Sequence, residues 1–593
     1  MNYIASVTDM LFNLRHIAKL DELAQLPGLE DASLETAQAV LNECAKFTQE
    51  VVAPLNHSAD QAPSYLKDGQ VHTSAGFPDA YKKFVAGGWQ GLQHPVDFGG
   101  QDLPKTIGAQ CIEMLTSASL SFSLAPILTN GAIEAMLTAG SDTLKALLLE
   151  KLVTGQWAGT MNLTESQAGS DLAQIRSRAE PTTDGQYKIF GTKIFITYGD
   201  QDLTENIVHL VLARVSGAPE GVKGISLFMV PKFLINADGS LGARNDVQCV
   251  SLEHKLGIKA SPTAVLQYGD AGGALGYLVG EENRGLEYMF IMMNAARYDV
   301  GMQGVGLAER AYQHAVAYAQ DRVQSRPVDG SAKHSVAIIQ HPDVRRMLMT
   351  MRSLTQGCRA MATYAAAAYD RAHHGPEAER EANQALYEFL VPLVKGFSTE
   401  MSLEVAQLGV QVHGGMGYIE ETGAAQHLRD AKILAIYEGT TAIQANDLVG
   451  RKTVRDGGQL AHSIVAQMLQ TASRLQAHGA PQAQAIASSL SAAAQALAQS
   501  IEFMVQHAKS APNAAYAGSV PYLLLAGNAV AGWQMAESWL AADALGAENQ
   551  AFAKAKKITA AFYAQHLLPR CAAAADSICN GAESVMALAN ADF

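Results

Sequence analysis

The sequence predicts a mainly helical protein with a central β domain. Apolar residues recur every three or four positions in the first quarter of the chain, which is typical of helices with one buried face. After Trp157 the pattern changes to short runs of β-branched and aromatic residues, which are typical of strands. From Leu286 the helical period returns. These observations predict an N-terminal helical domain, a β-barrel-like middle domain, a C-terminal four-helix bundle and an additional C-terminal helical bundle.

Length and composition indicate a multidomain globular protein. The 593 residues suffice for roughly four domains of about 150 residues each. A hydrophobic content of 48% with 17% charged residues is far from the composition of disordered chains. The net charge of −14 and the lack of a basic tract argue against nucleic acid as a partner, because phosphate binding requires clustered Lys and Arg.

The cysteines and the apolar stretches argue against a disulfide-rich, zinc-binding, secreted or membrane-spanning protein. The six cysteines are scattered without a CxxC pair or an adjacent His cluster, so neither a metal site nor a disulfide framework is indicated. The first residues lack a basic segment followed by an apolar run, as a signal peptide would have. The longest apolar stretch, Tyr522–Trp533, is shorter than the about 20 residues that a membrane helix needs. We expect a cytoplasmic protein with no membrane span.

The N-terminal part divides into an arm and a helical domain. Residues 1–33 carry aromatic and charged residues without a core of their own and are interpreted as an arm that packs on a larger body. Residues 34–157 are predicted to form the N-terminal helical domain, with helices within the segments Glu35–Asn56, Tyr81–Phe84, Ile107–Leu120 and Thr143–Leu152.

The middle β domain is predicted over residues 158–280. Its strands are short apolar runs separated by Gly, Asp and Asn, namely Tyr187–Phe190, Lys193–Thr197, Val208–Val215, Ile225–Val230 and Ala264–Tyr268.

Long amphipathic helices then predict an antiparallel bundle over residues 281–452. They are Leu286–Gln320, Pro342–Tyr369, Ala382–Val410 and Ala424–Ile436. Gly301, Gly304 and Gly306 lie inside the first of these helices with no preceding strand. They therefore indicate close helix packing rather than a dinucleotide-binding loop.

The tail, residues 455–593, is predicted to form a further helical domain. It is rich in Ala, Gln and Leu, but its apolar positions keep a helical period, which favours a folded bundle over a disordered tail. We expect four helices with breaks near Gly479-Ala480-Pro481, Pro512 and Gly546. The tail has no titratable cluster, so we expect it to cover a surface of the core or a subunit contact.

One stretch combines features of a binding site. Gln411-Val412-His413-Gly414-Gly415 opens it, and Arg429-Asp430-Ala431-Lys432 leads to Tyr437-Glu438-Gly439-Thr440-Thr441. Gly414 and Gly415 allow close backbone approach to a ligand, because glycine has no Cβ. Glu438, between two helical patterns, suits a catalytic base, but it also fits the acidic first turn of a capped helix. Both interpretations are open from these residues alone.

Read together, three segments resemble the acyl-CoA dehydrogenase family of flavoproteins. They are Met161–Asp171, Phe195–Thr197 and Arg429–Gln444, which occur in the order and spacing of that family over about residues 40–450. The family also has the order helix, sheet, helix. The resemblance implies an FAD-dependent enzyme that desaturates an acyl-CoA thioester at its α,β bond.

Glu438 is the catalytic base by this resemblance. Some family members place the base just before an arginine on an earlier helix, which corresponds here to Ala296, and alanine cannot accept a proton. A carboxyl group in a dry pocket beside acyl-CoA should have a raised pKa, which suits a general base near neutral pH. Gly439 leaves room for the thioester.

The resemblance also implies the FAD-binding residues. Phe195 stands where the family usually has tryptophan, so an aromatic plane remains while the indole N–H donor is lost. Arg322 matches an arginine that reaches the FAD of a neighbouring subunit, so we expect a homodimer at least. The complete set is Met161, Leu163, Thr164, Gly169, Ser170, Phe195, Ile196, Thr197, Arg322, Gln411, Gly414, Gly415, Thr440 and Thr441.

The expected partners are acyl-CoA and an electron-transfer flavoprotein. Ser170, Asn294, Arg297 and Gly439 match positions near the CoA thioester, although Arg297 also fits a structural ion pair. The arm and the extra C-terminal domain resemble the branch of 3-(methylthio)propanoyl-CoA dehydrogenases and bacterial fatty acyl-CoA enzymes of β-oxidation. An acyl-CoA oxidase that uses O2 and a non-catalytic protein of the same fold are the alternatives.

Overall fold

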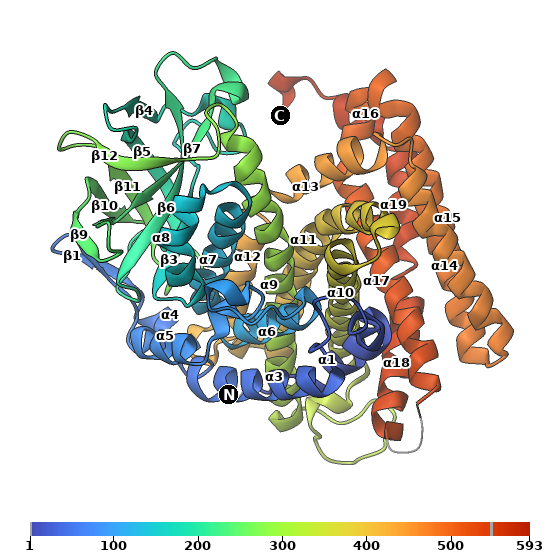
Figure 1. Ribbon diagram of the computed structural model, residues 1–593. Helices are drawn as coiled ribbons and strands as arrows, with labels where there is room; N and C mark the ends of the chain where they lie inside the picture. The colour runs from blue at the N-terminus through green and yellow to red at the C-terminus, as the bar shows by residue number, and fades with distance from the viewer. Residues whose placement is uncertain (1–2, 546–548) are drawn as a thin grey trace.

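The computed structural model describes residues 3–545 and 549–593 (Figure 1). The N-terminal arm is helical, with α1 (Val7–Asn13), a π-helical turn (Leu14–Ala18) and α2 (Leu20–Leu23). It packs on α3 (Leu34–Phe47) and α6 (Lys105–Ala118) through fully buried side chains, among them Met10, Leu14, Leu20 and Leu23. The arm thus shares its core with the N-terminal helices.

Six helices follow the arm. Serine hydroxyls cap several of them: Ser119 Oγ accepts from Phe122 N–H (3.4 Å) and starts a new helix where the sequence predicted one to end. The helices are α3 (Leu34–Phe47), α4 (Leu55–Gln61), α5 (Phe77–Ala86), α6 (Lys105–Ala118), α7 (Leu120–Ala139) and α8 (Asp142–Val153).

Helix α7 corrects the expectation that Tyr522–Trp533 is the longest apolar stretch of the chain. It is a longer apolar helix than Tyr522–Trp533, and by length and composition alone it would reach across a membrane. However, 83% of its most apolar window is buried inside the protein. Its apolar residues form core contacts with α8, β3 (Trp157–Asn162) and α9 (Gly285–Asp321).

The β domain is a closed sheet at one side of the molecule (Figure 1). Eight strands form it in the order β10-β11-β5-β12-β7-β6-β3, and β4 pairs with both β5 and β6, which closes the ring. The two runs predicted at Tyr187–Phe190 and Lys193–Thr197 are one strand, β5. The other strands are β4 (Arg178–Pro181), β5 (Tyr187–Thr197), β6 (Asn206–Val215), β7 (Ser226–Pro231), β10 (Val247–Leu252), β11 (Thr263–Tyr268) and β12 (Ala274–Val279).

Two short hairpins accompany this sheet. They are β1 (Tyr65–Lys67) with β2 (Gln70–His72), and β8 (Phe233–Ile235) with β9 (Leu241–Arg244).

The central bundle consists of α9, α10 (Pro342–His374), α11 (Glu377–His413) and α12 (Ala424–Leu434), followed by the short α13 (Thr441–Asp447). The predicted close packing of α9 is confirmed. A Cβ at Gly301 would lie 2.5 Å from Val394 O, and one at Gly304 would lie 2.7 Å from Ser398 O, both on α11. Helices α9 and α11 therefore approach closely and fix the frame of the bundle.

The tail is a helical domain with more breaks than the sequence predicted. It contains α14 (Gln459–His478), α15 (Pro481–Ser510), α16 (Pro512–Ala517), α17 (Ser519–Asp543), α18 (Gln550–His566), α19 (Arg570–Asn580) and α20 (Ala582–Met586). The unpredicted breaks fall at Gly518, Pro569 and Gly581, whereas the predicted break at Gly546 lies outside the described residues. Glycine and proline end helices, but the sequence contains too many to identify each break.

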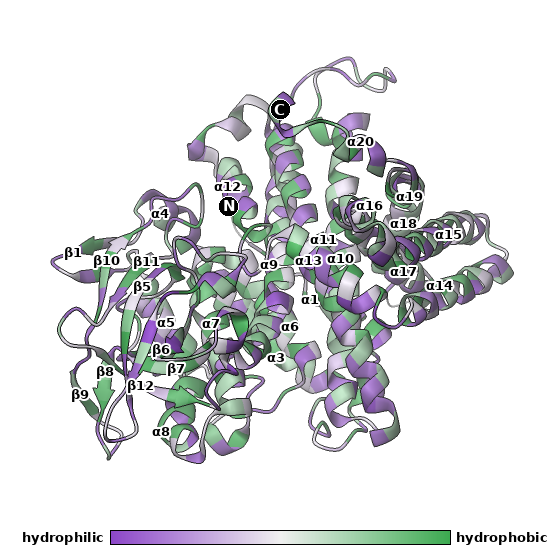
Figure 2. Ribbon diagram, turned by 90° about the horizontal axis from the view of Figure 1, so that it is seen from above, coloured by the Kyte–Doolittle hydropathy of each residue, from purple (hydrophilic) through white to green (hydrophobic). Residues whose placement is uncertain are grey.

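From above, the β domain and the tail helices lie on opposite sides of the central bundle (Figure 2). Helix α17 packs on α10 and α11, and α18 packs on α10, so the tail covers the face of the bundle that is turned away from the β domain. The fold class predicted from the sequence is confirmed. The other face of the bundle, against the β domain, holds the cavity described next.

Candidate active site

A cavity of about 610 Å³ lies between the β domain and the central bundle. Its walls come from segments far apart in the sequence: the loop after β3, the end of β5, the loop before β11, and helices α7, α9 and α12. Most of the predicted site residues meet here: Met161, Leu163, Thr164, Gly169, Ser170, Phe195, Ile196, Thr197, Arg297, Glu438, Gly439 and Thr440.

A buried ion pair fixes the wall contributed by the β domain. Lys193 Nζ, on β5, donates to Glu165 Oε1 (2.8 Å) and to Leu163 O (3.0 Å) in the loop after β3. Ile194 N–H donates to Thr164 O (2.9 Å). Burial by itself raises the pKa of Glu165, but the Lys193 ammonium and the hydrogen bonds outweigh it and lower that pKa to about 2. The loop is thus held on β5 by a carboxylate that is charged near neutral pH.

Phe195 presents its ring to the cavity at the end of this wall. Its side chain is 59% exposed although it lines a cavity, and its backbone is left-handed with φ of 60°. A bulky residue in this region is strained, and such residues concentrate at functional sites because the surrounding structure must hold them there. The ring is therefore placed for contact with a planar ligand.

Helix α12 holds a third segment of the wall. Asp430 Oδ1 accepts from Ile258 N–H (2.5 Å), and Arg429 donates to Leu256 O (3.1 Å). Ile258 is also left-handed, with φ of 45°. Burial raises the pKa of Asp430 to about 6, while the hydrogen bond from Ile258 acts in the opposite direction. Asp430 therefore supports the wall from behind, whereas Arg429 itself lines the cavity.

Glu438 lies in a turn between α12 and α13. It has φ of 53°, and Gly439 after it has φ of 86°. Thr440 is the N-cap of α13, because its Oγ1 accepts from Ile443 N–H (3.3 Å). The interpretation of Glu438 as an acidic first-turn residue is therefore wrong: Glu438 precedes the cap, and its half-buried side chain lines the cavity.

The carboxyl group of Glu438 is desolvated and has no hydrogen-bond partner among residues 3–545 and 549–593. Burial raises its pKa above the ordinary value, and the charges of Arg297 and Lys395 offset part of this effect. A desolvated carboxyl without a hydrogen bond can take up a proton near neutral pH. This property distinguishes Glu438 from Glu165.

Lys395 is a residue of this site that the sequence did not reveal. It lies on α11 with a fully buried side chain, and its Nζ donates to Gly439 O (2.6 Å). Burial lowers the pKa of Lys395 to about 7, with Glu438 acting in the opposite direction. A single lysine inside a predicted helix resembles any solvated position, so nothing in the sequence marks it.

Four predicted cofactor residues lie away from the cavity. Arg322 follows the end of α9, and Gln411, Gly414 and Gly415 stand at the end of α11; all four are exposed. The two helix ends are adjacent, since the rings of Tyr318 and His413 stack with centroids 4.3 Å apart. The structure thus groups these four residues on one exposed end of the bundle, separate from Glu438.

Two further predicted residues point elsewhere. Thr441 Oγ1 donates to Glu400 Oε1 (2.6 Å) and is buried behind the turn. Asn294 lines a different, more polar cavity of about 470 Å³ between α7, α9, α10 and α11, while its Oδ1 accepts from Arg297 (3.2 Å).

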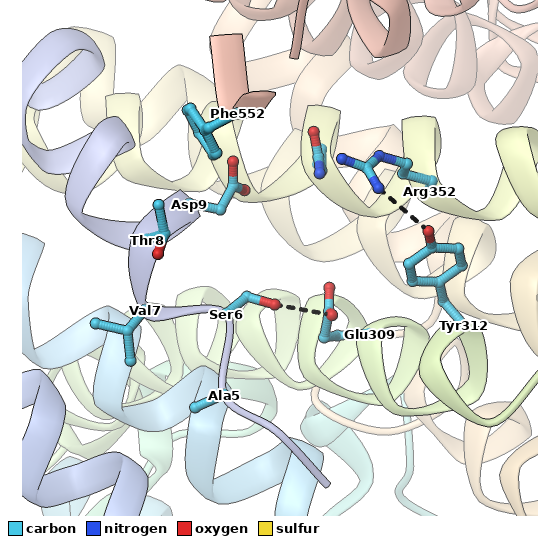
Figure 3. Close-up of a pocket in the computed structure, with 10 residues that line it drawn as sticks. Ala5, Ser6, Val7, Thr8, Asp9, Glu309, Tyr312, Arg352 and Phe552 are labelled. Carbon is cyan, nitrogen blue, oxygen red and sulfur yellow. Dashed lines mark hydrogen bonds between the residues drawn. The ribbon is translucent and has the colours of Figure 1, made fainter. Parts of the chain in front are cut away.

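A smaller pocket of about 220 Å³ lies between the arm, α9, α10 and α18 (Figure 3). Its polar groups bind one another: Ser6 Oγ donates to Glu309 Oε1 (2.9 Å), and Arg352 donates to Tyr312 OH (3.4 Å). The first contact fastens the arm to α9, and the second joins α10 to α9. None of the predicted site residues lies there.

Family models match the chain in succession. They are described as the acyl-CoA dehydrogenase N-terminal domain (residues 34–156), middle domain (160–271) and C-terminal domain (283–452), and as acetyl-CoA dehydrogenase C-terminal like (464–589). The chain belongs to the acyl-CoA dehydrogenase family, and it is an FAD-dependent acyl-CoA dehydrogenase.

Individual relatives cover the whole length. The 3-methylmercaptopropionyl-CoA dehydrogenase of Ruegeria pomeroyi is 54% identical over 588 residues, which are 99% of this chain and 99% of that protein. The broad-specificity linear acyl-CoA dehydrogenase FadE5 of Mycobacterium tuberculosis is 33% identical over 603 residues, 96% of each chain. An acyl-CoA dehydrogenase from Bacillus anthracis, solved with FAD, shares the fold with a TM-score of 0.73 at 23% identity, covering 94% of this chain and 90% of that one.

The residues around the cavity fit FAD. Phe195 offers an exposed aromatic face, and a Cβ at Gly169 would meet nothing within 4 Å, so the loop after β3 is open to a ligand. Arg297 Nε and Thr263 Oγ1 are buried polar atoms on this cavity without a hydrogen-bond partner in the described structure. Buried donors of this kind call for an acceptor, and a flavin or a thioester carries such acceptors.

Proposed function

We propose that this enzyme oxidises 3-(methylthio)propanoyl-CoA, or a fatty acyl-CoA of similar size, with Glu438 as the base. The observation that carries the proposal is the desolvated, unpaired carboxyl of Glu438 on the same cavity as Phe195 and the loop Met161–Ser170. The substrate follows from the name of the relative that is 54% identical over nearly the full chain, 3-methylmercaptopropionyl being the same acyl group.

The chain's own groups suit removal of the α-proton. Glu438 as a carboxylate takes this proton. Gly439 lines the cavity beside it, but a Cβ there would lie 2.6 Å from Gln444 Nε2, so this glycine makes room for Gln444 rather than, as expected from the sequence, for the thioester. The main-chain N–H of Glu438 has no backbone acceptor in the described structure, so it can donate to the thioester oxygen as negative charge develops there. FAD, when bound, supplies the acceptor for the β-hydride.

In this proposal the cofactor is held by both walls. Met161, Leu163, Thr164, Gly169, Ser170 and the strand Phe195–Thr197 would form the β-domain side, and Thr440 the bundle side. The exposed group of Arg322, Gln411, Gly414 and Gly415 would bind the FAD of a second subunit, which makes the enzyme a homodimer at least. Arg322→Ala should then lower FAD content without disturbing the monomer fold; full FAD content in a monomeric variant would contradict this part.

The substrate is tested with a panel of acyl-CoAs. The FAD-loaded enzyme is mixed anaerobically with 3-(methylthio)propanoyl-CoA, butanoyl-CoA and longer linear acyl-CoAs, and bleaching of the flavin absorbance is followed. We expect 3-(methylthio)propanoyl-CoA or butanoyl-CoA to give the highest kcat/KM. A preference for long chains, or no bleaching by any acyl-CoA, would overturn the assignment.

We further propose that an electron-transfer flavoprotein takes the electrons and that the enzyme acts in acyl-CoA breakdown. The oxidase alternative predicts peroxide under air at the rate of substrate consumption. The dehydrogenase predicts slow reaction with O2 and rapid turnover with an electron-transfer flavoprotein, so measuring both products separates the two. The cytoplasmic location stays a prediction, which cell fractionation tests.

A further inference from the structure

The turn that carries Glu438 is held from behind by two buried side chains. Lys395 Nζ donates to Gly439 O (2.6 Å), and Gln444 Nε2 donates to Glu438 O (3.2 Å). Both side chains are fully buried, Lys395 on α11 and Gln444 on α13. Each of the two consecutive carbonyl groups of the turn is therefore tied to a different helix.

The turn needs such anchors because its backbone is strained. Glu438 has φ of 53°, a left-handed conformation that a non-glycine residue keeps only where its surroundings hold it. With Glu438 in this conformation its side chain faces the cavity. If the turn relaxed, the carboxyl group would leave the position from which it reaches a bound thioester.

Lys395 acts without reaching the substrate space. It does not belong to the lining of the cavity, whereas Glu438, Gly439 and Arg297 do. Its ammonium therefore influences the site in two ways, through the Gly439 carbonyl and through its charge on the nearby carboxylate.

We propose that Lys395 is the positioning residue of this active site: it holds the left-handed turn so that Glu438 faces the substrate, and its positive charge favours the carboxylate form. This inference rests on the proposed role of Glu438 as the base. Gln444 supplies the second anchor but no charge. Comparing substitutions of Lys395 and Gln444 therefore separates the effect of anchoring the turn from the effect of a positive charge near Glu438.

Other charged groups surround Glu438 and stay in place when Lys395 is replaced. They are Arg297 on α9 with its counter-charge Asp447 on α13, Glu400 on α11, Tyr437 in the turn itself, and Lys255 and Lys432 on the cavity wall. Arg297 remains as a cation beside Glu438 in every variant. The loss of Lys395 therefore shifts the protonation of Glu438 without removing all support for its charge.

The test compares Lys395→Met, Lys395→Gln, Gln444→Met and Lys452→Met in the FAD-loaded enzyme. Flavin reduction by 3-(methylthio)propanoyl-CoA is followed anaerobically across pH values from below to above neutrality. Lys395→Met removes the anchor and the charge, Lys395→Gln removes the charge but keeps a polar group, and Gln444→Met removes an anchor only. Lys452 pairs with Glu388 away from the turn and serves as the control.

Lys395→Met should slow flavin reduction by about 10²-fold, the loss that misplacement of a catalytic group by about 1 Å can cause. Because a base must be deprotonated, activity falls as the pH drops through the pKa of Glu438. Removing the cation raises that pKa, so the acidic limb should move up by about one pH unit. Lys395→Gln should shift the acidic limb of the pH profile by the same amount. Gln444→Met should slow flavin reduction without shifting this limb, and Lys452→Met should change neither the rate nor the limb.

A further readout does not depend on turnover. In a crystal structure of Lys395→Met, the backbone of Glu438 should leave the left-handed region. The inference is overturned if Lys395→Met, or Lys395→Gln where the Met variant does not fold, keeps the wild-type rate and acidic limb. A loss of thermal stability with an unmoved limb also overturns it. Glu438→Gln tests the role of the base separately from the role of Lys395. If Glu438→Gln is inactive while the Lys395 variants behave as wild type, the positioning role of Lys395 is wrong and the role of Glu438 stands.

Discussion

Two buried lysines lie behind opposite walls of the same cavity; one forms an ion pair with a carboxylate, and the other donates a hydrogen bond to the backbone. Lys193 and Lys395 are both fully buried. Lys193 forms an ion pair with Glu165, which also accepts hydrogen bonds from Ser177 and Arg176 N–H, so that carboxylate stays charged. Lys395 instead donates to a backbone carbonyl, and the carboxyl group near it is left without a hydrogen bond.

The difference shows how a structural carboxyl group behind the wall of a cavity and a reactive one on its lining are kept apart. Hydrogen bonds and an ion pair hold the pKa of Glu165 low, whereas burial without them raises the pKa of Glu438. A carboxyl with a very low pKa is a poor base near neutral pH, and one with a raised pKa is a better one. The partners of each group, more than its residue type, decide its role.

Breaking the structural pair should have the largest effect on stability. Lys193→Met leaves Glu165 buried without its cation, which typically costs about 3–5 kcal/mol. We expect this loss in urea unfolding, together with reduced FAD content because the loop Leu163–Ser170 is released. The matched control is Glu180→Gln, which breaks the exposed pair with Arg178 in the same domain and should cost no more than about 1 kcal/mol. An equal loss of unfolding free energy in Lys193→Met and Glu180→Gln would show that the buried ion pair contributes no more stability than the exposed one.

The pH dependence of stability tests the same pair without substitution of the lysine. The folded-state pKa of Glu165 is lowered to about 2 from an ordinary value of 4.5, so its contribution is fully present above the ordinary pKa. That contribution is lost as the pH falls from about 4.5 toward 2. The free energy of unfolding of the wild type should therefore fall more steeply with decreasing pH in this window than that of Glu165→Gln. Parallel curves would show that folding does not lower the pKa of Glu165.

Removing the helix cap beside Glu438 should have an intermediate effect. Thr440→Ala removes the hydroxyl that accepts from Ile443 N–H and should destabilise the protein by about 1 kcal/mol. Because the cap adjoins the catalytic turn, flavin reduction should slow as well, and Thr440→Ser should restore both. Ser141→Ala removes the equivalent cap of α8 and should reduce stability alone. A Thr440→Ala enzyme with unchanged flavin reduction would show that the turn does not depend on its cap.

The smallest effect is expected at the aromatic residue of the β wall. Phe195 is 59% exposed, so Phe195→Trp should change the free energy of unfolding by no more than about 0.5 kcal/mol. The new indole then reports on the cofactor, and its fluorescence should be quenched when FAD is added to the FAD-free protein. Unquenched fluorescence with FAD bound would place the ring away from the flavin.

The sequence predicts the long amphipathic elements well and the uniformly apolar ones poorly. The predicted segments of α9, α10 and α11 lie inside the observed helices. The centres of α9 and α11 are buried on all sides, but towards their ends buried residues recur every three or four positions, which supplies the helical period. Helix α7 was not predicted as a unit because it is buried on nearly all sides, which leaves little period to detect. Strands β3, β4, β10 and β12 were not predicted. Length is not the reason, because the predicted β7 and β11 also have six residues; Gly, Pro, Gln or Ser interrupt the apolar run in each of the four.

At the site, the sequence predicted the residues that touch the cavity but not those that hold them. Lys395 is 44 residues from Gly439 in the chain, so only the packing of α11 behind the turn relates the two. The left-handed backbone at Phe195, Ile258 and Glu438 was equally hidden, because none of these residues is a glycine. Strain and tertiary contacts depend on the assembled fold rather than on local pattern.

The most direct measurement of the central claim, that Glu438 is the base, is anaerobic flavin reduction in Glu438→Gln. The amide is nearly isosteric but cannot accept the α-proton, so reduction by 3-(methylthio)propanoyl-CoA should slow by about 10²–10⁴-fold. FAD content and acyl-CoA binding should stay close to those of the wild type, because other residues line most of the cavity. Bleaching of the flavin at the wild-type rate would contradict the account and require a different base.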